Sequence, residues 1–86
     1  MNVTLYKSSL CPRCHLARKY LEQLKADQPD LEIEYVDILA SPRRTLSDGV
    51  RMIPAVKSGQ DILSGIYLDK KTIAAFLDQI RQNSTP

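Results

Sequence analysis

Cys11 and Cys14 are the only cysteines of the 86-residue chain, and Pro12 and Arg13 separate them. A segment of alternating character at 2–7 precedes the pair, and a helical pattern follows it. Residues three apart at the start of a helix lie on one side with Cβ atoms about 5–6 Å apart, so small adjustments bring two sulfurs into disulfide geometry. The spacing therefore predicts a redox-active dithiol that opens and closes a disulfide.

The expected environment of Cys11 favours its thiolate, the form that acts as a nucleophile. At a helix start, unpaired backbone N–H groups and the positive end of the helix dipole stabilise negative charge. Pro12 suits the first turn because its missing N–H needs no partner there, and Arg13 adds a positive charge. Cys14, one turn deeper, would attack the mixed disulfide and release the reduced substrate. We therefore predict Cys11 and Cys14 as catalytic residues, with Pro12 and Arg13 supporting the helix start.

The elements that must position this pair begin with two strands and a helix. Alternating apolar residues predict strands at 2–7 and 31–36. An apolar stripe at helical spacing predicts a helix from Cys11 to about Ala26. Because such a helix can serve as a crossover, the two strands should be parallel.

A second half of the chain adds a short helix, a hairpin and a last helix. The Ser41-Pro42 pair (41–42) is typical of a helix start, and Gly49 can end that helix. Apolar runs at 55–57 and 61–63 flank a short turn, which requires an antiparallel hairpin, and Asp69 can cap the final helix. The predicted order is βαβαββα, an α/β fold with a four-stranded mixed sheet and three helices.

The composition predicts one ordinary globular domain. Hydrophobic residues make up 43% of the chain and charged residues 26%. Twelve basic and ten acidic residues are spread along it, and no apolar run approaches the roughly 18 residues of a membrane span. Two cysteines cannot form the multi-bridge framework of small secreted domains. We expect a domain at 1–82, a disordered tail at 83–86, and a soluble, cytoplasmic monomer that binds neither nucleic acid nor membranes.

The order of the elements resembles the thioredoxin fold, and the motifs within it most resemble those of glutaredoxins. The Cys-Pro-x-Cys motif of that family, often followed by His, stands here at 11–15. The Thr-Val-Pro element corresponds to Met52-Ile53-Pro54, and the Gly-Gly element to Ser64-Gly65. The resemblance implies a thiol–disulfide oxidoreductase that reduces protein or glutathione mixed disulfides, without a tightly bound cofactor or a metal ion.

The resemblance also implies where a substrate docks. In glutaredoxins the proline that matches Pro54 is cis and faces the dithiol, which leaves the main chain before it free to pair with a bound peptide. From the residues alone a trans bond would be expected, since only about 5–6% of X-Pro bonds in folded proteins are cis. The implied docking residues, for protein substrates or for glutathione, are Met52, Ile53, Pro54, Ser64 and Gly65.

The source of electrons stays open at this stage. Glutaredoxins commonly carry a lysine three residues before the first cysteine, where it helps to hold a glutathione carboxylate, and Ser8 stands there in this chain. Arg43, Arg44 and Arg51 are the candidates to replace it. The reductant is therefore either glutathione or a flavin-dependent enzyme of the thioredoxin-reductase type.

Two other kinds of site fit parts of the motif. Cys-x-x-Cys-His is also the pattern for covalent haem attachment, with Met52 as a conceivable axial ligand, but the four predicted strands and the lack of an export signal disfavour a c-type cytochrome. Two cysteines and His15 leave a structural zinc site one ligand short. A cluster shared between two subunits occurs in some glutaredoxin relatives, so an iron–sulfur or metal-binding protein is the alternative function.

Overall fold

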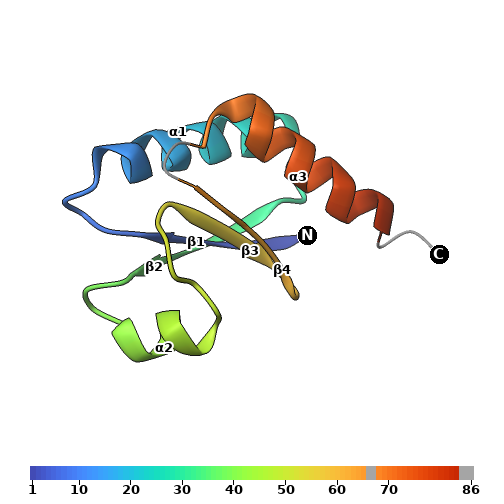
Figure 1. Cartoon of the computed structure of the whole chain (residues 1–86). Helices are drawn as coiled ribbons and strands as arrows, with labels where there is room; N and C mark the ends of the chain where they lie inside the picture. Colours follow the sequence, from blue (N-terminus) through green and yellow to red (C-terminus); the bar gives the residue numbers. More distant parts are fainter. Residues whose placement is uncertain (66–67, 84–86) are drawn as a thin grey trace.

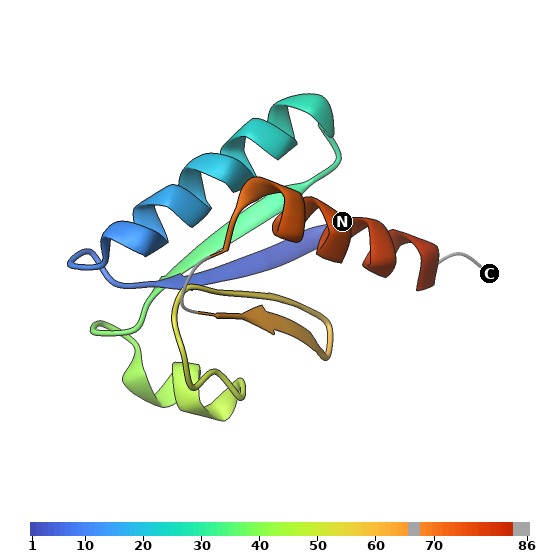
Figure 2. The same cartoon turned by 45° about the horizontal axis from the view of Figure 1, so that its top comes forward.

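A four-stranded sheet with helices on both faces forms the body of the protein. The computed structural model describes residues 1–65 and 68–83. Helices α1 and α3 cover one face of the sheet and α2 the other (Figures 1 and 2). The predicted order βαβαββα and the thioredoxin-like fold class are confirmed. In chain order the elements are β1 (Asn2–Lys7), α1 (Pro12–Asp27), β2 (Glu32–Asp37), α2 (Pro42–Ser47), β3 (Ala55–Ser58), β4 (Asp61–Ser64) and α3 (Lys70–Asn83).

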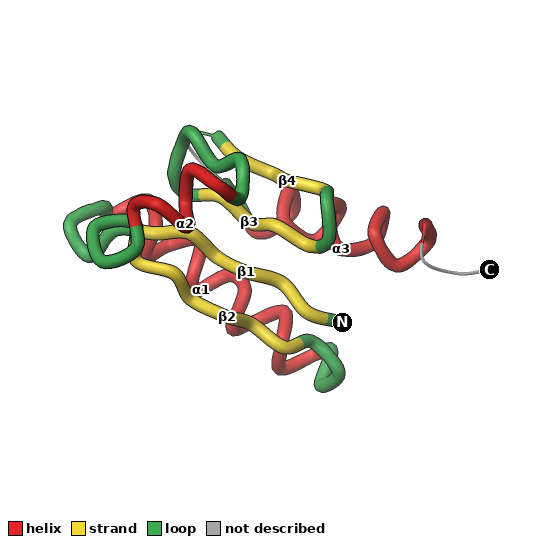
Figure 3. The backbone as a smooth tube through the Cα atoms, turned by 90° about the horizontal axis from the view of Figure 1, so that it is seen from below, coloured by secondary structure: helices red, strands yellow, loops and turns green. Residues whose placement is uncertain are grey.

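The strand pairing determines which chain segments meet. The strands lie in the order β2-β1-β3-β4 (Figure 3). As predicted, β1 pairs with β2 in parallel, and β3 and β4 form an antiparallel hairpin. The antiparallel register of β1 with β3 puts Tyr6 opposite Ala55, and Ala55 also lies opposite Ser64. The end of β1, the start of β3 and the end of β4 therefore lie at one end of the sheet.

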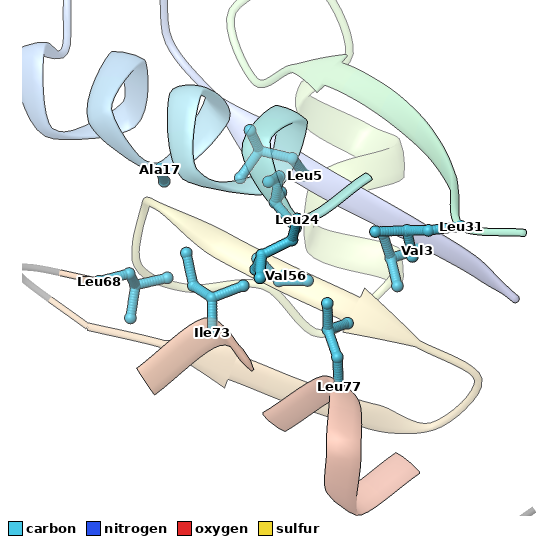
Figure 4. Packing of buried hydrophobic residues seen from close by; sticks show 10 residues of the cluster. Val3, Leu5, Ala17, Leu24, Leu31, Val56, Leu68, Ile73 and Leu77 are labelled. Carbon is cyan, nitrogen blue, oxygen red and sulfur yellow. The ribbon is translucent and has the colours of Figure 1, made fainter. Parts of the chain in front are cut away.

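The main core lies between the sheet and helices α1 and α3 (Figure 4). Strand alternation turns Val3 and Leu5 of β1 towards these helices, where both are buried. Leu68, just before α3, packs in the same cluster as Ile73 in its first turns, an arrangement that fixes the entry of the chain into the helix. The buried cluster consists of Val3, Leu5, Ala17, Leu21, Leu24, Leu31, Val56, Leu68, Ile73 and Leu77.

A smaller cluster lies on the opposite face of the sheet, on the side of α2. Because Tyr6 follows Leu5 on β1, its side chain points to this other face. The cluster consists of Tyr6, Val36, Val50 and Ala55, and Ile38 and Ile53 pack against it. The core therefore continues through the sheet to the segment that joins α2 to β3.

The start of α3 and the end of α2 have the predicted local signals, whereas the predicted cap at the start of α2 is absent. Asp69 Oδ1 accepts a hydrogen bond from the Thr72 amide at 2.7 Å, the predicted cap of α3. Gly49 follows the end of α2 with φ +85°, a backbone conformation that suits glycine. Ser41 occupies the cap position of α2, but its side chain makes no cap hydrogen bond, since its backbone (φ −133°, ψ 60°) is not extended there.

The C-terminal boundary differs by one residue from the prediction. Asn83 is the last residue of α3 rather than the first residue of a tail. The rest of the predicted tail, 84–86, lies outside the described residues. Among the helices of the described ranges, none has the length and apolar character needed to cross a bilayer.

Truncating the core should cost far more stability than truncating the surface. Leu21→Ala, in the fully buried centre of α1, should lower the free energy of unfolding by about 2–5 kcal/mol, because it leaves a cavity. The control Leu46→Ala, at a leucine that is 70% exposed, should change it by no more than about 0.5 kcal/mol. Urea unfolding measures both values, and equal losses would contradict the described core.

Candidate active site

The dithiol lies at the turn between β1 and α1, at the left of Figure 1. Ser8, which is buried, organises this turn. Its carbonyl accepts a hydrogen bond from the Cys11 amide at 3.1 Å, and its hydroxyl accepts one from the Leu10 amide at 3.2 Å. Cys11 then takes the position before the first residue of α1, with an extended backbone (φ −105°, ψ 108°), and Pro12 begins the helix as predicted.

Cys11 caps α1 with its sulfur. The Cys14 amide donates a hydrogen bond to Cys11 Sγ at 3.3 Å, the contact that a serine or aspartate oxygen makes at other helix starts. Burial of the thiol opposes ionisation, but hydrogen bonds from the thiol and amide of Cys14 and from the Arg13 side chain outweigh it and lower the pKa of Cys11. The site therefore stabilises a thiolate at Cys11.

Cys14 has the opposite character. It is fully buried, whereas Cys11 retains 8% exposure. Burial, and the hydrogen bond that its thiol donates to Cys11, raise the pKa of Cys14 to about 11. Both cysteines are free, so the structure shows the dithiol form. The Cys11 sulfur is thus favoured as a thiolate in a residue that keeps a small exposed area, and the Cys14 sulfur is a protonated thiol in a residue that keeps none.

The segment before β3 lies at the same end of the sheet as the dithiol, because β3 starts beside the end of β1. The Ile53–Pro54 bond is cis, as the family resemblance implied. Pro54 is buried, Ile53 half-buried and Met52 47% exposed. The backbones of Arg51, Met52 and Ile53 make no hydrogen bond to the described residues. Their main-chain groups are therefore available to a bound peptide.

An apolar pocket of about 310 Å³ lies between this segment and α2. Leu46, on the exposed side of the short helix, is 70% exposed, and Leu10, directly before Cys11, is 82% exposed. Sequence reasoning missed both leucines, because only the packing of the fold leaves them exposed. The pocket is lined by Ile38, Pro42, Thr45, Leu46, Val50, Arg51, Met52 and Ile53.

The remaining predicted docking residues lie at the same end of the sheet. Ser64 is the last residue of β4 and pairs with Ala55, directly after Pro54. Ser64 is exposed and Gly65 half-buried. Within the described residues, no hydrogen bond joins either of them to the cysteines. The strand pairing, rather than a hydrogen bond, brings Ser64 and Gly65 to the end of the sheet that holds the dithiol.

The described ranges 1–65 and 68–83 contain no group of three or more His, Cys, Asp or Glu side chains that could hold a metal ion. His15 is exposed, and its Nε2 lies 3.2 Å from the Ser9 carbonyl oxygen. The histidine of the motif is thus engaged with the turn before the helix.

Comparison with known proteins links this chain to thioredoxins. No family model matches it. A curated thioredoxin from Methanocaldococcus jannaschii is 25% identical over 63 residues, which cover 72% of this chain and 74% of the relative.

Solved structures of similar fold carry the same name. Desulfothioredoxin from Desulfovibrio vulgaris Hildenborough is 23% identical with a TM-score of 0.77, over 91% of this chain and 79% of its own. Thioredoxin O2 from Arabidopsis thaliana is 19% identical with a TM-score of 0.76, over 92% and 73%. Thioredoxin 1 from Thermosipho africanus TCF52B is 18% identical with a TM-score of 0.70, over 99% and 100%.

The chain is thus a thioredoxin-fold protein with a Cys-x-x-Cys pair at the start of its first helix. The broader part of the sequence-based assignment, the thioredoxin fold, is confirmed. The named relatives are thioredoxins rather than glutaredoxins, so the narrower resemblance stays a prediction.

Arg13 should be needed for the low pKa of Cys11. Arg13→Ala removes a group that stabilises the thiolate, so the pKa of Cys11 should rise and less thiolate should exist at a given pH. The pH profile of alkylation by iodoacetamide, which reacts with the thiolate, should move to higher pH. Arg18→Ala is the matched control, since Arg18 lies on the same helix and pairs with Glu22. An unchanged profile for Arg13→Ala would contradict this assignment.

Proposed function

We propose that this protein is a thiol–disulfide oxidoreductase that reduces disulfide bonds of protein substrates. The observation that carries the proposal is the contrast between the two thiols. Cys11 has a lowered pKa and some exposure, while Cys14 is buried with a raised pKa. A nucleophile and a shielded resolving thiol, held next to each other, are what disulfide exchange requires.

In the proposed reaction, the Cys11 thiolate attacks one sulfur of the substrate disulfide. A mixed disulfide forms, and the other substrate sulfur leaves as a thiolate that takes up a proton from water. Cys14 then attacks Cys11 Sγ and gives up its proton to water, and the second substrate thiolate leaves and takes up a proton from water. The substrate gains two electrons and two protons in all, and the protein ends with a Cys11–Cys14 disulfide.

The substrate would dock along the segment before β3. The unbonded main chain of Met52 and Ile53 would pair with the substrate backbone next to its cysteine, with Pro54, Ser64 and Gly65 around it. Apolar side chains of the substrate would contact the exposed Met52 and Leu10. The protein partners are thus disulfide-containing proteins.

We further propose that a flavin-dependent enzyme of the thioredoxin-reductase type supplies the electrons. Two observations support this choice over glutathione. The similar proteins are thioredoxins, and Ser8 stands where a glutathione-binding lysine is common. Of the three candidate anchors, Arg44 is already bound to Glu34 at 2.7 Å. Arg51, which lies next to the docking segment, is the candidate that could hold a glutathione carboxylate.

The two cysteines should separate the two steps. Cys11→Ser should abolish reduction of insulin by dithiothreitol through this protein, because no nucleophile remains. Cys14→Ser should accumulate the mixed disulfide, since nothing resolves it, and mass spectrometry of the trapped adduct measures this. Full activity of Cys11→Ser would overturn the mechanism.

A coupled turnover assay should identify the reductant. NADPH oxidation should be observed with thioredoxin reductase and be absent with glutathione plus glutathione reductase. Activity with glutathione instead, lost on Arg51→Gln but retained on Arg43→Gln, would support the glutaredoxin-like alternative. Inactivity with both electron sources, together with protein-bound iron, would favour the iron–sulfur or metal-binding alternative.

A further inference from the structure

Tyr6 is the one tyrosine among those described that is almost fully buried, with 1% exposure. It lies on β1, the strand that leads to Cys11. Its hydroxyl donates a 2.6 Å hydrogen bond to Asp48 Oδ2. Its ring belongs to the cluster against which Ile53, a predicted docking residue, packs. Tyr6 thus connects the strand of the dithiol with the segment that would receive the substrate.

Asp48 is the first residue of the connection from α2 to β3, residues 48–54, which contains the docking residues. It follows the last residue of α2, and its amide donates to the Arg44 carbonyl at 2.9 Å. Its own carbonyl accepts a hydrogen bond from Lys57 Nζ of β3 at 2.9 Å, and Arg44 Nε lies 3.5 Å from its carboxylate. Side chains from β1, α2 and β3 therefore converge on this one residue.

The docking residues Met52 and Ile53 make no backbone hydrogen bonds to the described residues. Val50 is the last residue before them with a backbone hydrogen bond, from its amide to the Thr45 carbonyl at 3.1 Å. The next residue whose backbone is paired is Ala55, which lies opposite Tyr6 in the sheet. Between these points, Ile53 is held by side-chain contacts with the cluster that contains Tyr6, and Met52 is the residue directly before it.

We propose that Tyr6 is a positioning residue for the reaction, which sets the place of Met52 and Ile53 relative to the dithiol through its bond to Asp48 and its packing in this cluster. This inference rests on the proposed function of the segment as the docking site. Tyr6 is buried and would not touch the substrate, so it would affect the reaction only by holding Met52 and Ile53 in position.

The hydroxyl is suited to act as a permanent donor. Burial and the hydrogen bond to Asp48 raise the pKa of Tyr6 to about 12, and the hydroxyl hydrogen bond in turn lowers the pKa of Asp48. At neutral pH the donor keeps its proton and the acceptor keeps its charge, which makes a short, charge-assisted hydrogen bond.

The test compares Tyr6→Phe with Tyr35→Phe. Each variant removes one tyrosine hydroxyl that donates to a carboxylate, since Tyr35 donates to Glu22 at 3.1 Å from the neighbouring strand β2. Tyr6→Phe should raise the KM for insulin reduction about three- to tenfold with kcat nearly unchanged, because the docking-competent position is less populated. Tyr35→Phe should leave the KM unchanged. Iodoacetamide alkylation of Cys11 should be the same in both variants.

Hydrogen–deuterium exchange of the reduced protein tests the inference without activity. The amides of Gly49 and Val50, which donate to the Leu46 and Thr45 carbonyls, should exchange faster in Tyr6→Phe than in the wild type or in Tyr35→Phe, while those of β1 should not. Asp48→Asn, whose amide oxygen can still accept from Tyr6, should keep slower exchange than Tyr6→Phe.

The outcomes separate this inference from the proposed function. Unchanged exchange at Gly49 and Val50 in Tyr6→Phe, or an equal rise of KM in Tyr35→Phe, would overturn the positioning role. Faster exchange at Gly49 and Val50 in a protein that cannot reduce insulin would show that Tyr6 holds residues 48–53 in place and would reject the proposed oxidoreductase activity.

Discussion

The antiparallel pairing of β1 with β3 is the constraint on which the rest of the structure depends. One strand ends in the turn that carries Cys11, and the other begins directly after Pro54. Because antiparallel partners run in opposite directions, the end of β1 and the start of β3 must lie side by side. This pairing brings the dithiol and the proposed docking segment to the same end of the sheet, although about forty residues of chain separate them. Buried apolar residues on both faces of the sheet hold the pairing in place.

Within that frame, the chemistry of the site depends on a small difference in position between two sulfurs. Cys11 occupies the cap of α1, where its sulfur accepts a hydrogen bond from the Cys14 amide, while the Cys14 side chain lies one turn further on and is fully buried. The same hydrogen bond from the Cys14 thiol stabilises the Cys11 thiolate and keeps the Cys14 proton in place. The two pKa values therefore move apart in part because the groups are neighbours. Burial also raises the pKa of Cys14, and Arg13 also lowers the pKa of Cys11.

Local signals were sufficient for most elements. The Asp69 cap, Gly49 after α2 and the short turn of the hairpin each act within a few residues, so their outcome does not depend on distant contacts. The Ser41 side chain was predicted less well, because the chain path from β2 sets its backbone angles away from those a cap needs. The sequence pattern indicated no end for the last helix, which ends at Asn83, since no breaker marks that position.

The sequence by itself determined the order of the elements and the placing of two cysteines at a helix start, because both follow from periodicity and spacing along a continuous stretch of chain. Only the tertiary structure decided that Leu10 and Leu46 stay exposed, that α2 and the docking segment form a pocket, and that Tyr6 is bonded to Asp48. The exposure of the two leucines depends on what the rest of the fold leaves uncovered, and the hydrogen bond of Tyr6 joins two residues that are 42 positions apart in the sequence. The packing of sheet and helices brings them together, and no local pattern records that packing.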